Sequence, residues 1–104
     1  MPEADLRPIE PMLEAMWRAK ATDLHLTADS PPLMRVDGAL TPIEGHEILG
    51  RDAATQLIQT VLGSTLSERV AAEREVDASF GWGDRARLRA NAYHQRGALT
   101  LALR

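Results

Sequence analysis

The residues most suggestive of chemistry are arginines close to the end of the chain. Eleven of the 12 cationic side chains are arginine rather than lysine. Five of them fall within the last 20 residues: Arg85, Arg87, Arg89, Arg96 and Arg104. No acidic residue follows position 84. A guanidinium group presents a planar set of donors that suits carboxylates and phosphates, so this part of the chain could bind a phosphate-bearing ligand.

Two of these arginines are brought together by a hairpin predicted over residues 86–104. Small or apolar residues alternate there with polar ones, which is typical of two half-buried strands. A register shifted by one residue would set the leucines of the last strand opposite the arginines, which is excluded if one face of the hairpin is buried. The registers with turns at 95–96 or 96–97 remain. Arg89 lies directly across from Arg104 in the second register and two positions away in the first. In both registers the two guanidinium groups share one face.

Like charges on facing positions are destabilising, so we expect opposite charge nearby. One source is internal, because Glu75 and Asp77 lie on the polar face of the preceding strand and could pair with Arg87 or Arg89. The other source is a bound polyanion such as a phosphate, which suits paired arginines. The sequence contains no GxxxxGK[ST] or GxGxxG loop, so another domain or chain would have to hold a nucleotide.

The elements that would position this face follow from the apolar periodicity. Short strands are predicted at 22–27, 33–36 and 40–43, the last two joined by an Asp-Gly turn at 37–38. Helices are predicted at 8–20, at 52–63 with Asp52 as N-cap, and from Ser64 or Thr65 to 73, before three strands in the last third. Because strands neighbour strands and helices neighbour helices, we expect an α+β fold. It would have an antiparallel sheet of about six strands, an N-terminal helix and a central helix pair.

Composition narrows the function further. The chain has 104 residues, 44% of them hydrophobic, as in one ordinary soluble domain. It has no cysteine, which excludes disulfides, cysteine zinc sites and thiol catalysis. The net charge of −3 argues against nucleic-acid binding, and no apolar run approaches the roughly 20 residues that cross a bilayer. The three histidines have no metal-ligand spacing and no nucleophile has a base at hand, so we expect neither a metal site nor a catalytic centre here.

Six motifs resemble those of the PilT-type secretion ATPases, the motors that retract type IV pili, and occur in the family's order. They are ATDLHLT at 21–27, SPPLMRVDG at 30–38, EVDASF at 75–80, ARLRAN at 86–91, YHQRG at 93–97 and LALR at 101–104. The resemblance covers the chain from about residue 12 to 104. Three positions depart from the family pattern: Gly81 replaces a tyrosine, Leu88 an aromatic residue and Ala98 a glycine.

The resemblance implies that residues 1–104 form a PAS-like N-terminal domain, followed in the parent protein by a RecA-like ATPase domain. The parent would be a cytoplasmic P-loop ATPase, peripheral at the inner membrane, that uses ATP and Mg²⁺. This domain alone would bind neither and would not be catalytic. The family forms homo-hexamers in which this domain packs on the ATPase domains of its own and neighbouring subunits, and the motor acts on the inner-membrane platform of the pilus. The resemblance places Arg89, Arg104 and Arg96 near the nucleotide phosphates.

An alternative is a free-standing PAS-like module that binds a ligand or partner without catalysis. The inward-facing positions of the predicted elements are leucine, valine and alanine with few polar exceptions. This pattern favours a filled core over an internal ligand cavity. The resemblance leaves open whether the parent motor drives retraction or extension.

Overall fold

The computed structural model describes residues 3–104. Its elements are the 3₁₀ turn η1 (Arg7–Ile9), α1 (Glu10–Ala19), β1 (Asp23–Leu26), β2 (Leu33–Val36), β3 (Ala39–Pro42), α2 (Arg51–Leu62), α3 (Ser64–Glu73), β4 (Glu75–Trp82), β5 (Ala86–Gln95) and β6 (Ala98–Leu103). The expected α+β fold, with an N-terminal helix and a central helix pair, is confirmed. None of the helices in the described range is long and apolar enough to cross a bilayer.

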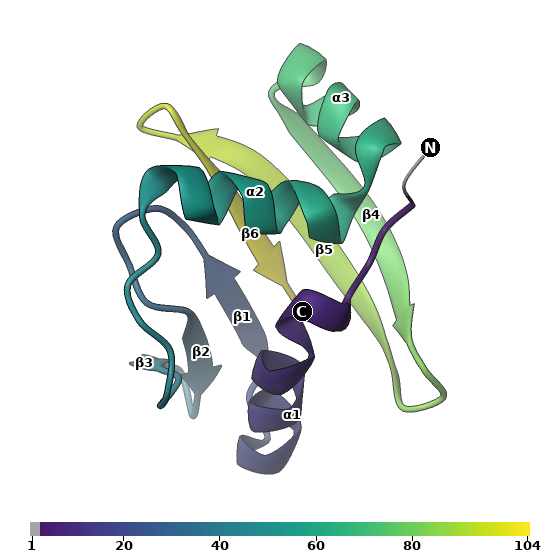
Figure 1. Ribbon diagram of the computed structural model, residues 1–104. Coiled ribbons are helices and arrows are strands. Elements are labelled where there is room, and N and C mark those ends of the chain that lie inside the picture. The colour runs from purple at the N-terminus through teal and green to yellow at the C-terminus, as the bar shows by residue number, and fades with distance from the viewer. Residues whose placement is uncertain (1–2) are drawn as a thin grey trace.

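The six strands form one antiparallel sheet in the order β3-β2-β1-β6-β5-β4. The first and last strands of the chain therefore lie side by side at the centre, and β3 and β4 form the two edges. Helices α1 and α2 lie on the same face of the sheet, with α2 crossing over its central strands and α3 beside β4 (Figure 1). The opposite face carries no helix in the part of the chain that the structure describes.

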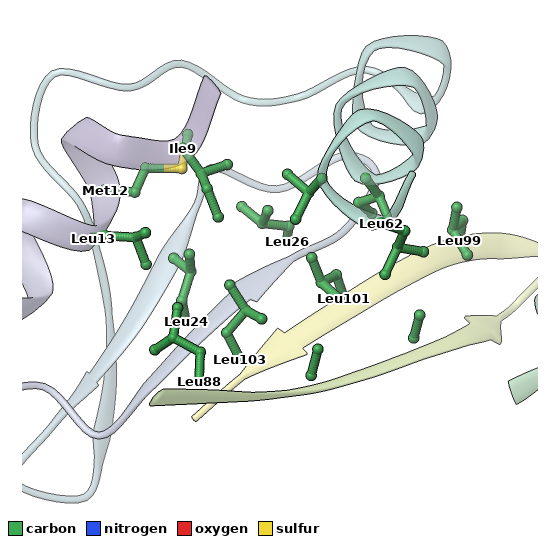
Figure 2. Packing of buried hydrophobic residues seen from close by; sticks show 14 of the residues in the cluster. Ile9, Met12, Leu13, Leu24, Leu26, Leu62, Leu88, Leu99, Leu101 and Leu103 are labelled. Carbon is green, nitrogen blue, oxygen red and sulfur yellow. The ribbon is translucent and has the colours of Figure 1, made fainter. Parts of the chain in front are cut away.

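The core lies between the central strands and the helices (Figure 2). Leu24 and Leu26 of β1, Leu101 and Leu103 of β6, and Ile58 of α2 are fully buried. Burying a leucine or isoleucine side chain contributes about 1.5–3 kcal/mol each, so these two strands hold the helices in place. The leucine and alanine positions that the alternation assigned to the inward face do face the helices, and the core is filled as expected.

The turns of the β2–β3 and β5–β6 hairpins share one backbone geometry. Asp37 and Gly38 have φ values of +50° and +82°, and Arg96 and Gly97 have values of +54° and +76°. Two successive residues with positive φ are typical of the type I′ turn, whose twist matches that of the flanking strands. The second turn settles the open question of register, because Gln95 pairs with Ala98 and the turn is 96–97.

The two central helices begin differently from expectation. Asp52 is not the N-cap of α2: Gly50 occupies that position, and its carbonyl accepts the N–H of Ala54 at 2.8 Å. Asp52 lies instead in the first turn, where a negative charge is favourable near the positive end of the helix dipole. The N-cap of α3 is Gly63, not Ser64 or Thr65, and Gly63 also ends α2. Its φ of +83° is accessible to glycine and strained for other residues.

Candidate functional site

A row of polar side chains crosses the helix-free face of the sheet from β2 to β4. In order it contains Arg35, Asp23, Arg104, Arg89 and Ser79. Asp23 faces Arg35 across β1 and β2, and Arg89 faces Ser79 across β5 and β4. The register between β1 and β6 sets Asp23 beside Arg104. Because alternate residues of a strand point to the same face, all five side chains lie on the face opposite the helices.

Arg89 of β5 and Arg104, the residue directly after β6, occupy opposed positions and are called here the arginine pair. The N–H of Arg89 donates to the carbonyl of Arg104 at 3.1 Å, and the N–H of Arg104 donates to the carbonyl of Arg89 at 2.8 Å. Both residues are exposed. Within residues 3–104 neither guanidinium group makes a hydrogen bond or ion pair. Two cationic donors are thus held on neighbouring central strands with their side chains directed to solvent.

The internal counter-charges considered from the sequence are engaged elsewhere. The register sets Asp77 opposite Asn91 and Glu75 opposite Tyr93, away from the arginine pair. The Asn91 amide donates to Asp77 Oδ1 at 2.8 Å and to Glu75 Oε1 at 3.0 Å. Arg87 donates through Nε to the hydroxyl of Ser79 on β4 at 2.9 Å. In the described part of the chain, the two carboxylates of β4 therefore do not neutralise the arginine pair.

Asp23 is the carboxylate next to the arginine pair in this row. Its Oδ2 atom accepts the Nε–H of Arg35 at 3.0 Å and lies 3.7 Å from His25 Nε2. Burial raises the pKa of Asp23, but the hydrogen bond and charge of Arg35, with the charges of His25 and Arg104, outweigh it and lower the pKa. The His25 Nε2 atom is buried and has no hydrogen-bond partner among the described residues. Asp23 is thus ionised near neutral pH and is already paired with Arg35.

An open groove of about 710 Å³ runs over this face beside the arginine pair. It is lined mostly by polar side chains, among them His25, Asp77, Arg89, Asn91, Tyr93 and Arg104. The donors of two adjacent guanidinium groups suit the oxygens of a phosphate. Their charge would repel Mg²⁺, so the pair fits the phosphates of a nucleotide and not its metal ion.

Arg96 is not brought to the same place. It lies in the turn at the far end of the hairpin, seven residues along β5 from Arg89. At a rise of about 3.3 Å per residue the two positions are roughly 23 Å apart. Within one copy of this chain, Arg96 cannot contact the same phosphate group as the arginine pair.

The sequence did not point to Asp23, His25 and Arg35 as neighbours of the arginine pair. The alternation of residues 22–27 places Asp23 and His25 together on a polar face. Which strand that face adjoins depends on the pairing of β1 with β6, about 77 residues further along the chain. The sequence did show that residues 23–25 (Asp-x-His) and 100–104 (Thr-x-Ala-x-Arg) both alternate as strands do. Such alternation does not specify which strand pairs with which.

Several known structures are similar to this chain, among them one PilT and two DotB proteins. The pilus retraction motor PilT, solved with bound ADP, is 33% identical over 92% of this chain, with a TM-score of 0.81. The ATPase DotB of Legionella pneumophila is 22% identical over the whole chain, with a TM-score of 0.77, and DotB of Yersinia pseudotuberculosis is 11% identical over 96%, with a TM-score of 0.70. At these identities the two DotB structures support the fold alone.

No protein-family model matches the sequence, and no curated protein matches it significantly. The chain spans 28–30% of the length of the three similar structures. The alignment with PilT nevertheless covers 92% of this chain. The chain is therefore similar, in fold and in sequence, to the N-terminal domain of PilT-type secretion ATPases.

Proposed function

We propose that this chain is the first domain, residues 1–104, of a hexameric ATP-driven motor that powers retraction of type IV pili. Support comes from the 33% identity with PilT, a protein described as a pilus retraction motor with bound ADP. A RecA-like ATPase domain follows in this proposal and carries the phosphate loop that residues 1–104 lack. The motor is cytoplasmic and acts at the inner-membrane platform of the pilus.

The observation that carries the proposal is the arginine pair on the helix-free face. In the assembled ring this face covers the nucleotide held by a neighbouring subunit's ATPase domain, and Arg89 and Arg104 donate to its phosphates. The ATPase domain holds ATP and Mg²⁺, and Mg²⁺ neutralises charge on the phosphate oxygens. The arginine pair adds positive charge to the same phosphates, in the manner of an arginine finger. The role of Arg96 at the far end of the hairpin stays a prediction.

The position of the pair explains why it would respond to the nucleotide as a unit. Both arginines are fixed through reciprocal backbone hydrogen bonds between two adjacent strands near the centre of the sheet. Beyond the reach of its own side chain, neither arginine can therefore follow a phosphate without carrying the sheet with it. Loss of the γ-phosphate after hydrolysis would weaken the attraction between this face and the ATPase domain, and the domain would move as a rigid body.

The first test is the open reading frame beyond Arg104. A GxxxxGK[ST] loop within roughly the next 40 residues, after a predicted strand, is expected if an ATPase domain follows. A stop codon close to Arg104 would contradict the motor proposal. It would favour the stand-alone PAS-like binding module, whose arginine pair would then meet an anion from elsewhere.

The second test uses Arg89→Ala and Arg104→Ala in the full-length protein. Removing a preorganised donor from a developing charge costs about 10²–10³-fold in kcat, so each variant should lose ATPase activity to that extent while still forming hexamers. Arg69→Ala is the matched control, because Arg69 lies on α3 and pairs with Glu73 at 3.2 Å. Unchanged ATPase rates in both test variants would rule out the assigned role.

A further inference from the structure

A second groove lies at the end of the molecule where α1 meets the β4–β5 hairpin. Its volume is about 520 Å³, and most of its lining is apolar. Apolar groups come from α1, from the residues that follow it, and from the ends of β4 and β5: Leu13, Met16, Trp17, Ala21, Trp82, Ala86 and Leu88. Trp17 is exposed at this groove, whereas Leu13, Met16, Trp82 and Leu88 are buried members of the core, so only a small part of each is accessible from the groove.

Two tryptophans form the aromatic wall of this groove, the exposed Trp17 and the buried Trp82. Trp17 is 51% exposed, and its ring lies edge-on to Trp82 with 5.9 Å between centroids. The guanidinium carbon of Arg85 lies 5.2 Å from the centroid of Trp17 and 4.6 Å from that of Trp82. Arg85 also pairs with Glu14 of α1. These contacts fix the tryptophan rings before any partner arrives, so binding them requires little loss of conformational entropy.

The rim of the groove is cationic. Lys20, Arg87 and Arg104 line it, and no carboxylate does. None of these three side chains forms an ion pair within residues 3–104, and Arg87 makes one hydrogen bond, to a serine hydroxyl. An apolar floor with three cations at its edge, none of them in an ion pair, is complementary to an acidic segment that also carries bulky apolar side chains.

We infer that this groove is a docking site for an acidic amphipathic peptide segment of a partner protein. One or two leucine-like side chains of the segment pack against Trp17 and Leu88, and its carboxylates meet Lys20 and Arg87. This is helix-in-groove recognition, in which anchors at i and i+3 or i+4 enter a single apolar groove. The contacts of the segment are assigned to Trp17, Leu88, Lys20 and Arg87; of the groove lining, only Arg104 is shared with the role proposed at the nucleotide.

The charge of the whole chain selects a peptide over other anionic partners. The net charge of the chain is −3. An extended membrane surface or nucleic acid would meet this negative charge over a wide area and would be repelled. A short peptide meets only the local rim.

Intrinsic fluorescence provides a direct test, because Trp17 and Trp82 are the two tryptophans of the sequence and both line the groove. The probe is a tryptophan-free peptide with leucines four residues apart among aspartates and glutamates. It should change the emission of the 104-residue chain saturably, with a dissociation constant below about 1 mM. Affinity should fall as salt rises from about 0.05 to about 0.3 M.

Two control peptides separate the contributions. Replacing the acidic residues of the probe by lysine, or its leucines by serine, should weaken binding at least tenfold. Equal binding of the lysine peptide would overturn the charge argument, and equal binding of the serine peptide would overturn the apolar one. A stronger response to vesicles of phosphatidylglycerol than to the acidic peptide would overturn the choice of partner.

Variants locate the binding on this surface. Lys20→Glu should lower the affinity for the acidic peptide at least fivefold, as measured by calorimetry. Arg18→Glu, on α1 and outside the groove lining, should leave this affinity unchanged. Trp17→Ser removes an exposed side chain and leaves Trp82 as the reporter, so it provides a second test should the charge reversal disturb folding. Full affinity in both Lys20→Glu and Trp17→Ser would refute the inference.

Discussion

Replacement of Gly63 by alanine should be among the most damaging single-methyl changes in this domain. Gly63 links α2 to α3 with φ at +83° and ψ at +169°, a combination almost confined to glycine. A side chain there costs about 1–3 kcal/mol in backbone strain alone. A methyl group at this position would also lie 2.6 Å from the nitrogen of Ala4 and 2.7 Å from the carbonyl carbon of Glu3. Both are backbone atoms, so no flexible side chain can move aside.

Relief of that overlap requires the N-terminal segment to move away from the helix corner. The movement would break the hydrogen bond from the Asp5 N–H to the Val61 carbonyl, 3.2 Å long, which contributes about 1 kcal/mol. Together the two effects should lower the free energy of unfolding by about 2–4 kcal/mol. For a domain of this size the melting temperature should fall by roughly 10–25 °C.

Urea unfolding followed by circular dichroism measures this difference, with Gly81→Ala as the matched control. A methyl group at Gly81 meets only the Arg87 guanidinium at an ordinary 3.5 Å, and glycine is unfavourable within a strand by about 0.5–1 kcal/mol, so this change should be neutral or stabilising. The measurement should be repeated after deletion of residues 1–4, which removes the overlap and leaves the strain. A Gly63→Ala penalty equal to that of Gly81→Ala would refute the argument, and a penalty that the deletion leaves unchanged would refute the contact part of it.

Three other substitutions test the core, the pairing of Asp23 with Arg35, and the hydrogen bonds that Asn91 donates to the two β4 carboxylates. Leu101→Ala, at a fully buried position, should cost about 2–5 kcal/mol in urea unfolding, whereas Leu40→Ala, 45% exposed on an edge strand, should cost under about 1 kcal/mol; similar costs would contradict the assigned core. The lowered pKa of Asp23 means that its ionised form stabilises the fold at neutral pH and that this contribution is lost as pH falls below about 4. Asp23→Asn should therefore be less stable than wild type by about 1–2 kcal/mol at neutral pH, with the two converging in acid, and a gap independent of pH would contradict the pairing with Arg35. Asn91→Ala should cost about 1–2 kcal/mol by leaving the two β4 carboxylates facing each other without a donor; no loss of stability would show that the amide is dispensable.

The local structure and the arginine pair could be predicted from the sequence because both depend on short-range patterns. The alternation of leucines in the last strand allowed only registers that put Arg89 and Arg104 on one face. The sequence left turns at 95–96 and 96–97 open, and the structure settles the direct pairing, because Arg96 and Gly97 have the positive φ values of a type I′ turn. The shared face of the two arginines needed no information beyond the residues within one hairpin.

What the sequence could not supply were relations between distant segments. The pairing of β1 with β6 brings Asp23 beside Arg104, and no local signal specifies it. Asn91 binds the β4 carboxylates because of the register of β4 against β5. Charge alone would have predicted that these carboxylates pair with Arg87 or Arg89. The apolar groove at Trp17 likewise exists only because α1 packs against the far end of that hairpin.

The position of β6 in the sheet has a mechanical consequence. The strand that ends at Leu103 is hydrogen-bonded on both sides, to β1 and to β5, and both neighbours run antiparallel to it. A tension applied at Arg104 along the strand would have to shear two hydrogen-bond ladders at once, whereas an edge strand such as β3 could be peeled away one bond at a time. A pull transmitted through Arg104 would therefore move this domain as a stiff body before extracting the strand.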